Sequence, residues 1–296
     1  MSAEKRLKIA IQKSGRLADT SLQLLEKCGI FLEKSRDQLL CRAQNFPLDI
    51  FLVRDDDIPA FLATDVCQLG ILGQNTLLEK QTEGNGKFSS LEQLLLIGHG
   101  KCRLSIAVPH DFRYDSIASL NGKVIATSYK GLLRQYLEIH KIEADIVTME
   151  GAVEVAPRTH LADVICDLVS TGSTLNSNGL VEKDVILQSQ AVLVTNQISD
   201  DKIAALADKI TSRIKAVLRA ENSRYIMLNS PTNSLDAIKA VLPGSQSPTV
   251  MPLQGRDDMV AVHAVCEEEV FWDTMEHLQA NGANSILVVP IEKMLD

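Results

Sequence analysis

The chain has 296 residues, of which 45% are hydrophobic and 23% are charged, and its formal net charge is −8. This length allows two or three domains with a substantial core, and the acidic balance argues against nucleic acid or an anionic membrane as a partner, because either would require clustered Lys and Arg. The six cysteines lie far apart without a CxxC pair, which argues against a disulfide framework or a zinc site.

The chain begins with a polar segment, residues 1–6, which lacks the apolar core of a signal peptide. No stretch reaches membrane-spanning length, so we expect a cytoplasmic protein. Strand-like and helix-like segments then alternate, which predicts an α/β architecture with mostly parallel sheets. The predicted strands are 7–11, 48–53, 68–73, 103–108, 123–127, 145–149, 163–169 and 191–195, and the predicted helices are 19–28, 132–140 and 201–220.

The last part of the chain has a different order of elements. Strand, helix, two strands, helix and strand are predicted at 225–228, 234–242, 249–253, 259–265, 268–280 and 285–289. This βαββαβ order is typical of a ferredoxin-like fold. A compact unit of this kind at the end of an enzyme is often a ligand-sensing module, so we expect a regulatory domain here.

Basic residues follow the first predicted strand, at the end where parallel sheets place their ligands. Gly15 allows the backbone to approach a ligand closely, and Lys13 and Arg16 are suited to phosphate. An exposed arginine near a helix start is the simpler interpretation, although the helix dipole slightly disfavours a cation there. The segment is therefore a candidate anion site.

Two further strand ends carry candidate residues. Arg54 is a possible phosphate contact, whereas the acidic run 55–57 before Pro59 is better explained as a helix start, with Asp capping the helix, than as a Mg²⁺ site. Gly70, Gly73 and Asn75 suit a backbone that approaches a ligand, although a turn that requires positive φ explains the glycines equally well.

The most informative segment is 164–175, in which an apolar strand contains a single acid, Asp167, and then enters a loop of small residues. The loop is followed by a predicted helix start, where backbone N–H groups bind anions. Helix capping is the alternative. The four hydroxyl residues exceed what one cap needs, so a phosphate site is preferred: Ser170, Thr171, Ser173 and Thr174. Glu154 is a candidate for a ribose hydroxyl or, alternatively, lies on a solvated helix face.

Five motifs in order along the whole chain resemble one family, the long form of ATP phosphoribosyltransferase. They are 12–17 (QKSGRL), 53–59 (VRDDDIP), 154–157 (EVAP), 167–175 (DLVSTGSTL) and 289–294 (VPIEKM). The resemblance implies a two-lobed catalytic core similar to type II periplasmic binding proteins, followed by a ferredoxin-like (ACT-like) regulatory domain. Lobe I would comprise residues 1–104 and 190–224, lobe II residues 105–189, and the regulatory domain residues 225–296.

The resemblance also implies the reaction. The 5-phosphoribosyl group of phosphoribosyl pyrophosphate (PRPP) would be transferred to N1 of ATP, giving N1-(5-phosphoribosyl)-ATP and pyrophosphate. This is the first step of L-histidine biosynthesis, and histidine would inhibit it by feedback. Mg²⁺ would be bound through the substrate phosphates, with no protein ligand assigned. The chain would form homo-oligomers, dimers and hexamers.

Residues matching the family motifs receive roles from the same resemblance. Arg16 and Asp167 would be catalytic. PRPP would contact Glu154, Asp167, Ser170, Thr171, Gly172, Ser173, Thr174 and Leu175, and ATP or its polyphosphate would contact Lys13, Gly15, Arg16, Arg54, Gly70, Gly73 and Asn75. Regulatory histidine would lie near Leu253, Ala283 and Ser285. Arg36 matches a second family arginine only approximately, and its role stays open.

Two other functions compete with this one. A non-catalytic ligand-binding subunit on the same lobes would tolerate loss of Arg16 and of the hydroxyl loop, and both are intact. A phosphoribosyltransferase of the commoner type would carry two adjacent acids before its phosphate loop, whereas Cys166 precedes Asp167 here. Both alternatives are therefore weaker than the enzyme.

Overall fold

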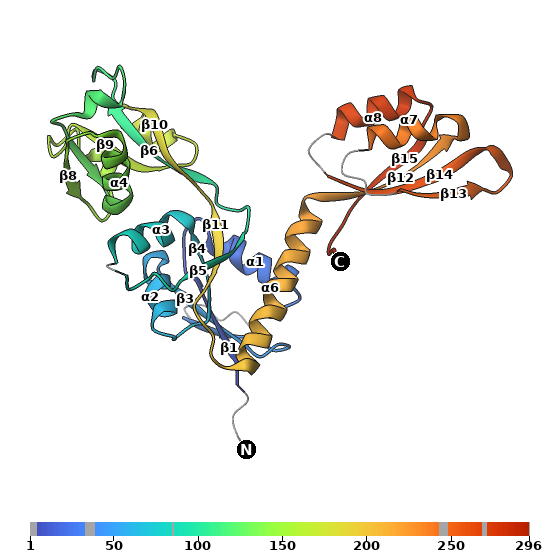
Figure 1. Ribbon diagram of the computed structural model, residues 1–296, viewed down its shortest axis with the longest axis horizontal. Coiled ribbons are helices and arrows are strands. Elements are labelled where there is room, and N and C mark those ends of the chain that lie inside the picture. Colours follow the sequence, from blue (N-terminus) through green and yellow to red (C-terminus); the bar gives the residue numbers. More distant parts are fainter. Residues whose placement is uncertain (1–4, 33–38, 85, 243–247, 268–270, 296) are drawn as a thin grey trace. The chain divides into compact units, whose positions relative to one another are not determined.

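The computed structural model describes residues 5–32, 39–84, 86–242, 248–267 and 271–295 (Figure 1). The chain divides into two compact units, Met1–Asp208 and Lys209–Asp296. The first unit contains two α/β lobes, each built on its own sheet, and the second contains a third sheet. Within the described residues, no helix is both long enough and apolar enough to cross a membrane.

Lobe I is built on a six-stranded sheet with the order β2-β3-β1-β4-β11-β5. Its central strands β1, β3 and β4 run parallel, and their side chains are largely buried, as expected where both faces of a parallel sheet are covered. The strands are β1 (Leu7–Gln12), β2 (Leu40–Arg42), β3 (Leu48–Val53), β4 (Leu69–Gly73), β5 (Glu92–Leu96) and β11 (Ala191–Thr195), and the helices are α1 (Ala18–Lys27), α2 (Ile58–Ala63) and α3 (Gln74–Glu83).

Lobe II is built on a five-stranded sheet with the order β10-β6-β9-β7-β8. β7, β8 and β9 run parallel, while β6 runs antiparallel to β9 and β10. The strands are β6 (Cys102–Pro109), β7 (Val124–Thr127), β8 (Asp145–Thr148), β9 (Val164–Val169) and β10 (Leu180–Ser189), and the helices are α4 (Lys130–His140) and α5 (Ser173–Ser177). The chain enters lobe II between β5 and β6 and returns between β10 and β11 (Figure 1).

The second unit contains a four-stranded antiparallel sheet, preceded by helix α6 (Asp201–Glu221), and the boundary between the two units along the chain falls inside this helix. The sheet order β13-β14-β12-β15 is that of a ferredoxin-like fold, as the βαββαβ pattern predicts. The elements are β12 (Ser223–Pro231), α7 (Leu235–Val241), β13 (Thr249–Leu253), β14 (Arg256–Glu267), α8 (Phe271–Ala280) and β15 (Asn284–Pro290). The division at residue 208 differs from the expected one at 224.

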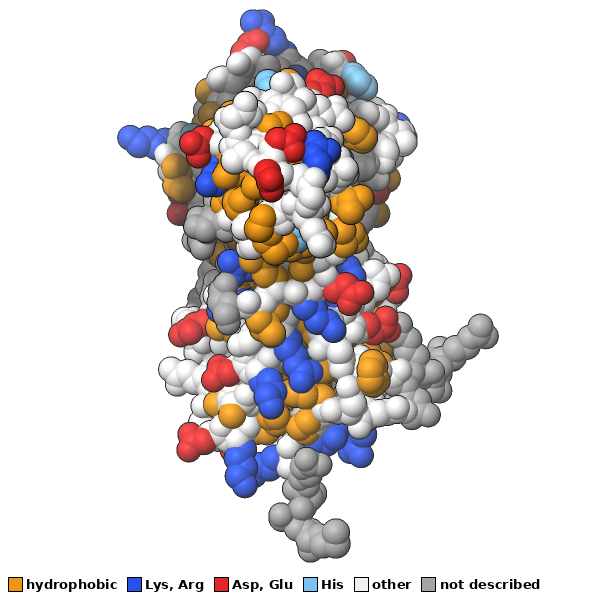
Figure 2. Space-filling view, turned by 90° about the vertical axis from the view of Figure 1, so that its right-hand side faces the viewer, with side chains coloured by type: hydrophobic (Ala, Val, Ile, Leu, Met, Phe, Trp, Pro, Cys, Tyr) orange, Lys and Arg blue, Asp and Glu red, His pale blue; other side chains and the backbone are white. Residues whose placement is uncertain are grey.

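Helices α7 and α8 cover one face of this sheet, where the buried core includes Ile226, Ile238 and Leu278 (Figure 1). Side chains at the centre of the opposite face are half-buried or exposed. One row across it is Thr249, His263, Met227 and Leu287, and Leu287 is 58% exposed. Figure 2 shows hydrophobic side chains gathered in its upper part, where the second unit faces the viewer.

The sequence does not predict β2, β5, β10, α2 or α3 as separate elements, although the start of α2 is expected from the acidic run and Pro59, which lies in its first turn. β10 is hard to recognise because its residues do not alternate cleanly and its pairing with β6 shifts between Glu182 and Leu187. α3 follows β4 without a loop and has a weak apolar stripe. The predicted helix start at residue 268 lies outside the described residues.

Candidate active site

The carboxyl ends of β1, β3 and β4 lie at one edge of the lobe I sheet because these strands are parallel. The Lys13 N–H donates to the Val53 carbonyl over 2.8 Å, which ties the loop after β1 to the end of β3. Gly15 has φ +105°, and Gln12 Oε1 accepts the Leu17 N–H over 2.9 Å. These two hydrogen bonds hold the backbone of the loop in place. The side chains of Lys13 and Arg16 are exposed.

The acidic run after β3, residues 55–57, forms hydrogen bonds to the start of α3, whereas the sequence predicts a cap on α2. Its residues form a short 3-10 turn, and neither that turn nor α2 has a side-chain cap. Asp55 instead accepts the Gly73 N–H at 3.4 Å and the Thr76 hydroxyl at 2.6 Å, both at the start of α3. The prediction that these aspartates cap the helix directly after them is therefore wrong. Burial raises the pKa of Asp55, opposed by these two hydrogen bonds.

Gly70 and Asn75 have protein contacts that account for them without a ligand. A Cβ at Gly70 would lie 2.7 Å from Ile58 Cγ2, so the glycine allows α2 to pack on β4. Asn75 is 2% exposed. Its Oδ1 accepts the Ser189 hydroxyl at 2.8 Å and its Nδ2 donates to the Tyr129 hydroxyl at 3.0 Å. Gly73 begins α3, and a Cβ there would lie 2.5 Å from Asn75 Oδ1.

In lobe II the parallel strands β7, β8 and β9 bring a second set of loops to one edge. Left-handed backbone at Gly151 (φ +130°) and Ala152 (φ +50°) precedes the turn that carries Glu154. Asp167 in β9 accepts the Leu168 N–H over 2.7 Å. Burial and, to a smaller extent, the charge of Glu154 raise the pKa of Asp167 to about 6. The structure thus brings the two predicted ribose contacts within interaction distance.

The hydroxyl loop is an open anion-binding geometry. Gly172 has φ +81° and is the N-cap of α5, which has no side-chain cap hydrogen bond. The Thr171 and Ser173 hydroxyls lie 3.1 Å apart, and the side chains of Ser170, Thr171, Ser173 and Thr174 are exposed. Leu175 is buried in the lobe core and anchors the helix. Backbone N–H groups of a helix start and four exposed hydroxyls therefore lie together in one short loop.

Sequence reasoning missed the residues that support this loop from β6. Arg103 stands opposite Val169 in the register of β6 and β9, and its Nη1 donates to the Ser170 carbonyl over 3.2 Å. Its other guanidinium nitrogens pair with both oxygens of Glu182 in β10, which also accepts the Ser105 hydroxyl at 2.8 Å. This pairing lowers the pKa of Glu182. Because the partners are far apart in sequence, no local motif shows them.

Tyr129 shows that the two edges face one another. Burial raises the pKa of its hydroxyl, and the charges of Asp56 in lobe I and Asp167 in lobe II raise it further. Tyr129 is therefore near carboxylates of both lobes. Arg16 in turn acts on Asp55. The hydroxyl of Tyr129, which accepts a hydrogen bond from Asn75 of lobe I at 3.0 Å, is thus a point where the two lobes come close.

The residues proposed for regulatory histidine lie apart within one chain. Leu253 ends β13, Ala283 is buried in the core, and Ser285 is the second residue of β15, with φ +50°. Since β13 and β15 are the two edge strands of the sheet, Leu253 and Ser285 are separated by about 14 Å of sheet width. One copy does not bring these two residues together. Arg36 lies outside the described residues.

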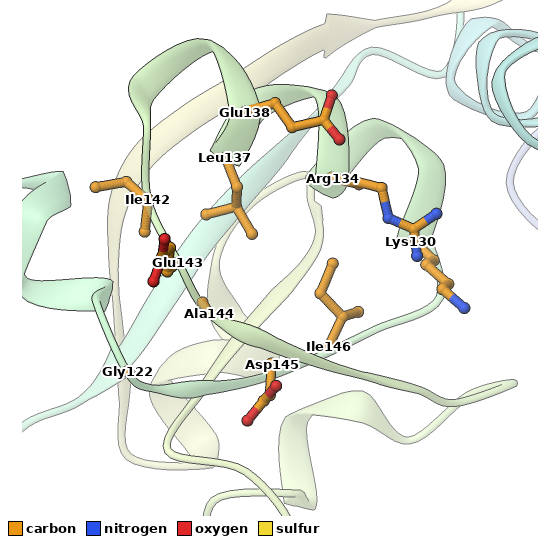
Figure 3. A pocket seen from close by; sticks show the side chains of 10 residues that line it. All are labelled: Gly122, Lys130, Arg134, Leu137, Glu138, Ile142, Glu143, Ala144, Asp145 and Ile146. Carbon is orange, nitrogen blue, oxygen red and sulfur yellow. The ribbon is translucent and has the colours of Figure 1, made fainter.

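The described part of lobe II also has an open pocket of about 590 Å³ between α4 and β8. Figure 3 shows Lys130 and Arg134 side by side on α4, while Leu137 and Ile146 form an apolar floor. None of the predicted substrate residues lines this pocket. Among the described residues, no group of three or more His, Cys, Asp and Glu side chains is arranged to hold a metal ion.

Comparison with known proteins gives consistent matches. A family model described as ATP phosphoribosyltransferase matches residues 54–216, and one described as the HisG C-terminal domain matches residues 220–293. An ATP phosphoribosyltransferase of Maricaulis maris is 48% identical over 291 residues, 98% of this chain and 99% of the relative. The structure of an ATP phosphoribosyl transferase (HisG:HisZ) complex from Thermotoga maritima is similar with a TM-score of 0.58 and 30% identity, covering 71% of this chain and 98% of that chain.

Proposed function

This chain belongs to the ATP phosphoribosyltransferase family, and from that premise we propose how its residues divide the work of the reaction. It is a pentosyltransferase that joins the phosphoribosyl group of PRPP to N1 of ATP and releases pyrophosphate. The reaction is the first step of histidine biosynthesis. Its two substrates are assigned to the two facing edges of the lobes.

The hydroxyl loop holds the 5-phosphate of PRPP. The observation that carries this assignment is the geometry at residues 170–175: Gly172 in left-handed backbone, four exposed hydroxyl residues and the start of α5, where Gly172 provides no side-chain cap. Such a loop supplies N–H and O–H donors to a phosphate without requiring a cation. Asp167 and Glu154, whose charge contributes to the raised pKa of Asp167, accept hydrogen bonds from the ribose hydroxyls.

Lobe I binds the triphosphate of ATP. Lys13, Arg16 and Arg54 follow adjacent parallel strands, and the side chains of Lys13 and Arg16 are exposed. The backbone at Gly15 and Gly73 completes this edge. A divalent metal, which we assign as Mg²⁺, would be bound through the substrate phosphates and would neutralise part of their charge. We propose that Arg16 places a positive charge beside the polyphosphate and that Asp167 places a negative charge beside the ribose.

The bond-making step needs positioning more than proton transfer. N1 of adenine carries no proton before it attacks the anomeric carbon, so no strong general base is required. The transition state resembles an oxocarbenium ion as pyrophosphate leaves. Arg16 stabilises the negative charge of the polyphosphate, and the ionised form of Asp167 lies on the ribose side, where positive charge develops.

The enzyme assignment is tested by pyrophosphate release. Release should require ATP and PRPP together, and Arg16→Met should lower kcat/KM for ATP about 100-fold, because it removes a cation that binds the ATP triphosphate. Lys8→Met, which removes a cation outside the basic loop, is the control. A folded wild-type protein that releases no pyrophosphate with both substrates would instead support the non-catalytic subunit.

We assign feedback inhibition by histidine to the second unit, where a ferredoxin-like sheet follows the catalytic lobes. Leu253 and Ser285 lie on opposite edges of that sheet, so a site containing both requires two copies of the chain. This fits a homo-oligomer that changes between dimer and hexamer. Histidine should lower activity and shift the sedimentation coefficient of the full chain. Full inhibition by histidine of a chain lacking residues 225–296 would contradict the assignment.

We place the enzyme in the cytoplasm. All six cysteines are buried thiols with no disulfide bond between them. Reduced cysteines of this kind are typical of a reducing compartment. A cell fractionation that finds the activity with cytosolic markers is the expected result, and activity confined to an oxidising compartment would contradict it.

A further inference from the structure

Helix α4 of lobe II begins without a cap of its own. Its N-cap residue, Tyr129, makes no side-chain hydrogen bond to the helix. The first N–H groups of a helix have no partner inside the helix and need an acceptor from elsewhere. Here the acceptor comes from lobe I. Glu79 of α3 accepts the Gly131 N–H at 2.7 Å and the Leu132 N–H at 2.9 Å, one with each carboxylate oxygen.

Glu79 is an acidic side chain in a buried position, where a charged group is unusual. The residue is 5% exposed, and no Lys or Arg of the described chain forms an ion pair with it. Burial raises the pKa of its carboxyl, and the two backbone hydrogen bonds oppose that shift. A carboxylate at a helix N-terminus gains from the two donors and from the helix dipole. The two backbone donors of α4, and not an ion pair, are therefore the main stabilisation of this charge.

The same face of α3 holds α4 at two further points. One turn before Glu79, Asn75 donates to the hydroxyl of Tyr129 at 3.0 Å. One turn after Glu79, the helices approach so closely that a Cβ at Gly131 would lie 2.8 Å from Glu83 Cγ and 3.0 Å from Thr82 Cγ2. These contacts form a continuous seam between the lobes.

We propose that Glu79 is a positioning residue that aligns lobe II with lobe I by capping α4 from across the seam. The proposal rests on the function proposed above, in which PRPP is bound by lobe II and the ATP triphosphate by lobe I. PRPP binding then needs lobe II alone. Attack by N1 on the anomeric carbon needs both lobes in register, because small displacements of reacting groups cost large factors in rate.

Substitution of Glu79 by Gln keeps the size of the side chain but replaces one acceptor oxygen by an NH₂ group facing a backbone N–H. One hydrogen bond to a charged group is lost, and we expect kcat to fall about 10- to 100-fold. The dissociation constant for PRPP should stay within about twofold, because no residue of the PRPP loop is changed. The matched control is Glu138→Gln, the same change on the exposed side of α4 (Figure 3).

Gly131→Ala tests the seam from the other side. Gly131 lies inside α4, where alanine has the higher helix propensity, so a role limited to the stability of α4 predicts a stable variant with normal kcat. Our proposal predicts lower kcat with unchanged PRPP affinity, because the added methyl group pushes α3 and α4 apart. This variant also carries the test if Glu79→Gln does not fold.

The experiment combines three measurements on the full chain: kcat by pyrophosphate release, PRPP affinity by calorimetry, and hydrogen exchange at the amides of Gly131 and Leu132. Glu79→Gln should lower kcat, spare PRPP binding and speed exchange at both amides. Unchanged kcat, or a loss of PRPP affinity in parallel with kcat, overturns the proposal. If wild-type protein released no pyrophosphate, the proposed function would fail. In that case, unchanged hydrogen exchange at the Gly131 and Leu132 amides of Glu79→Gln would show, independently of any activity, that Glu79 does not cap α4.

Discussion

Substitution of Asp167 by Asn should raise the stability of the folded protein while it lowers the transferase activity. Its pKa is raised from 3.8 to about 6, chiefly by burial, so at neutral pH the folded state holds a carboxylate at a cost. Two pKa units correspond to about 3 kcal/mol at about 1.36 kcal/mol per unit. Asp167→Asn removes the charge and keeps the oxygen that accepts the Leu168 N–H. We therefore expect the variant to be about 1–3 kcal/mol more stable than wild type at neutral pH.

The sign of the pH dependence follows from proton binding. Between about pH 4 and pH 6 the folded state still binds the proton that the unfolded chain has released, so the wild-type free energy of unfolding falls as pH rises. Above about pH 6 the penalty is complete and constant. The advantage of Asp167→Asn should therefore be near zero at about pH 4, grow through this window and level off above it.

Urea unfolding followed by circular dichroism, repeated across this pH range, measures the difference. Asp111→Asn is the matched control, since it changes an exposed aspartate of the same lobe. The variant should also lose most of its transferase activity, because the proposed ribose acceptor loses its charge. A variant that is less stable than wild type at neutral pH, or a gain that does not change with pH, would refute the reasoning.

Three further substitutions test the supports of the site. Arg103→Met should raise the KM for PRPP about tenfold, because the Ser170 carbonyl loses its donor. Arg103→Lys should give a KM between those of wild type and Arg103→Met. Equal KM values for wild type and Arg103→Met in steady-state kinetics would contradict a supporting role for Arg103. Thr171→Val should weaken PRPP binding about tenfold in calorimetry while leaving ATP binding unchanged, and equal losses for both substrates would count against the loop assignment. Gly70→Ala should lower the free energy of unfolding by about 1–3 kcal/mol through overpacking against Ile58, and an unaffected urea midpoint would contradict this.

The sequence predicts the fold well where apolar periodicity is strong. β1, β3 and β4 are short apolar runs that end in polar or glycine-rich turns, and the parallel order of such runs places their loops at one edge. The hydroxyl loop after β9 is recognisable for the same reason. Its glycine and its run of hydroxyl residues are local features, and local features are what a sequence shows.

The remaining features depend on contacts between distant residues. Asp55 lies before α2 but caps α3, because β3 and β4 bring it beside Gly73. Asn75 lies after a glycine-ended strand, as a ligand contact would, yet its amide is bonded to Ser189 and Tyr129.

Arg103 and Glu79 also have their effects through distant partners. Arg103 supports the Ser170 carbonyl, which lies 67 residues further along the chain. Glu79 caps a helix that begins 51 residues later, at Lys130. No spacing rule within a single sequence reveals such partners.

A crystal structure of the protein with bound PRPP tests the central claim most directly. We expect the 5-phosphate to be bound by the backbone N–H groups and hydroxyls of residues 171–174, and the ribose hydroxyls to be bound by Asp167 and Glu154. A 5-phosphate bound instead by Arg16 and Arg54 of lobe I, with the hydroxyl loop empty, would contradict it.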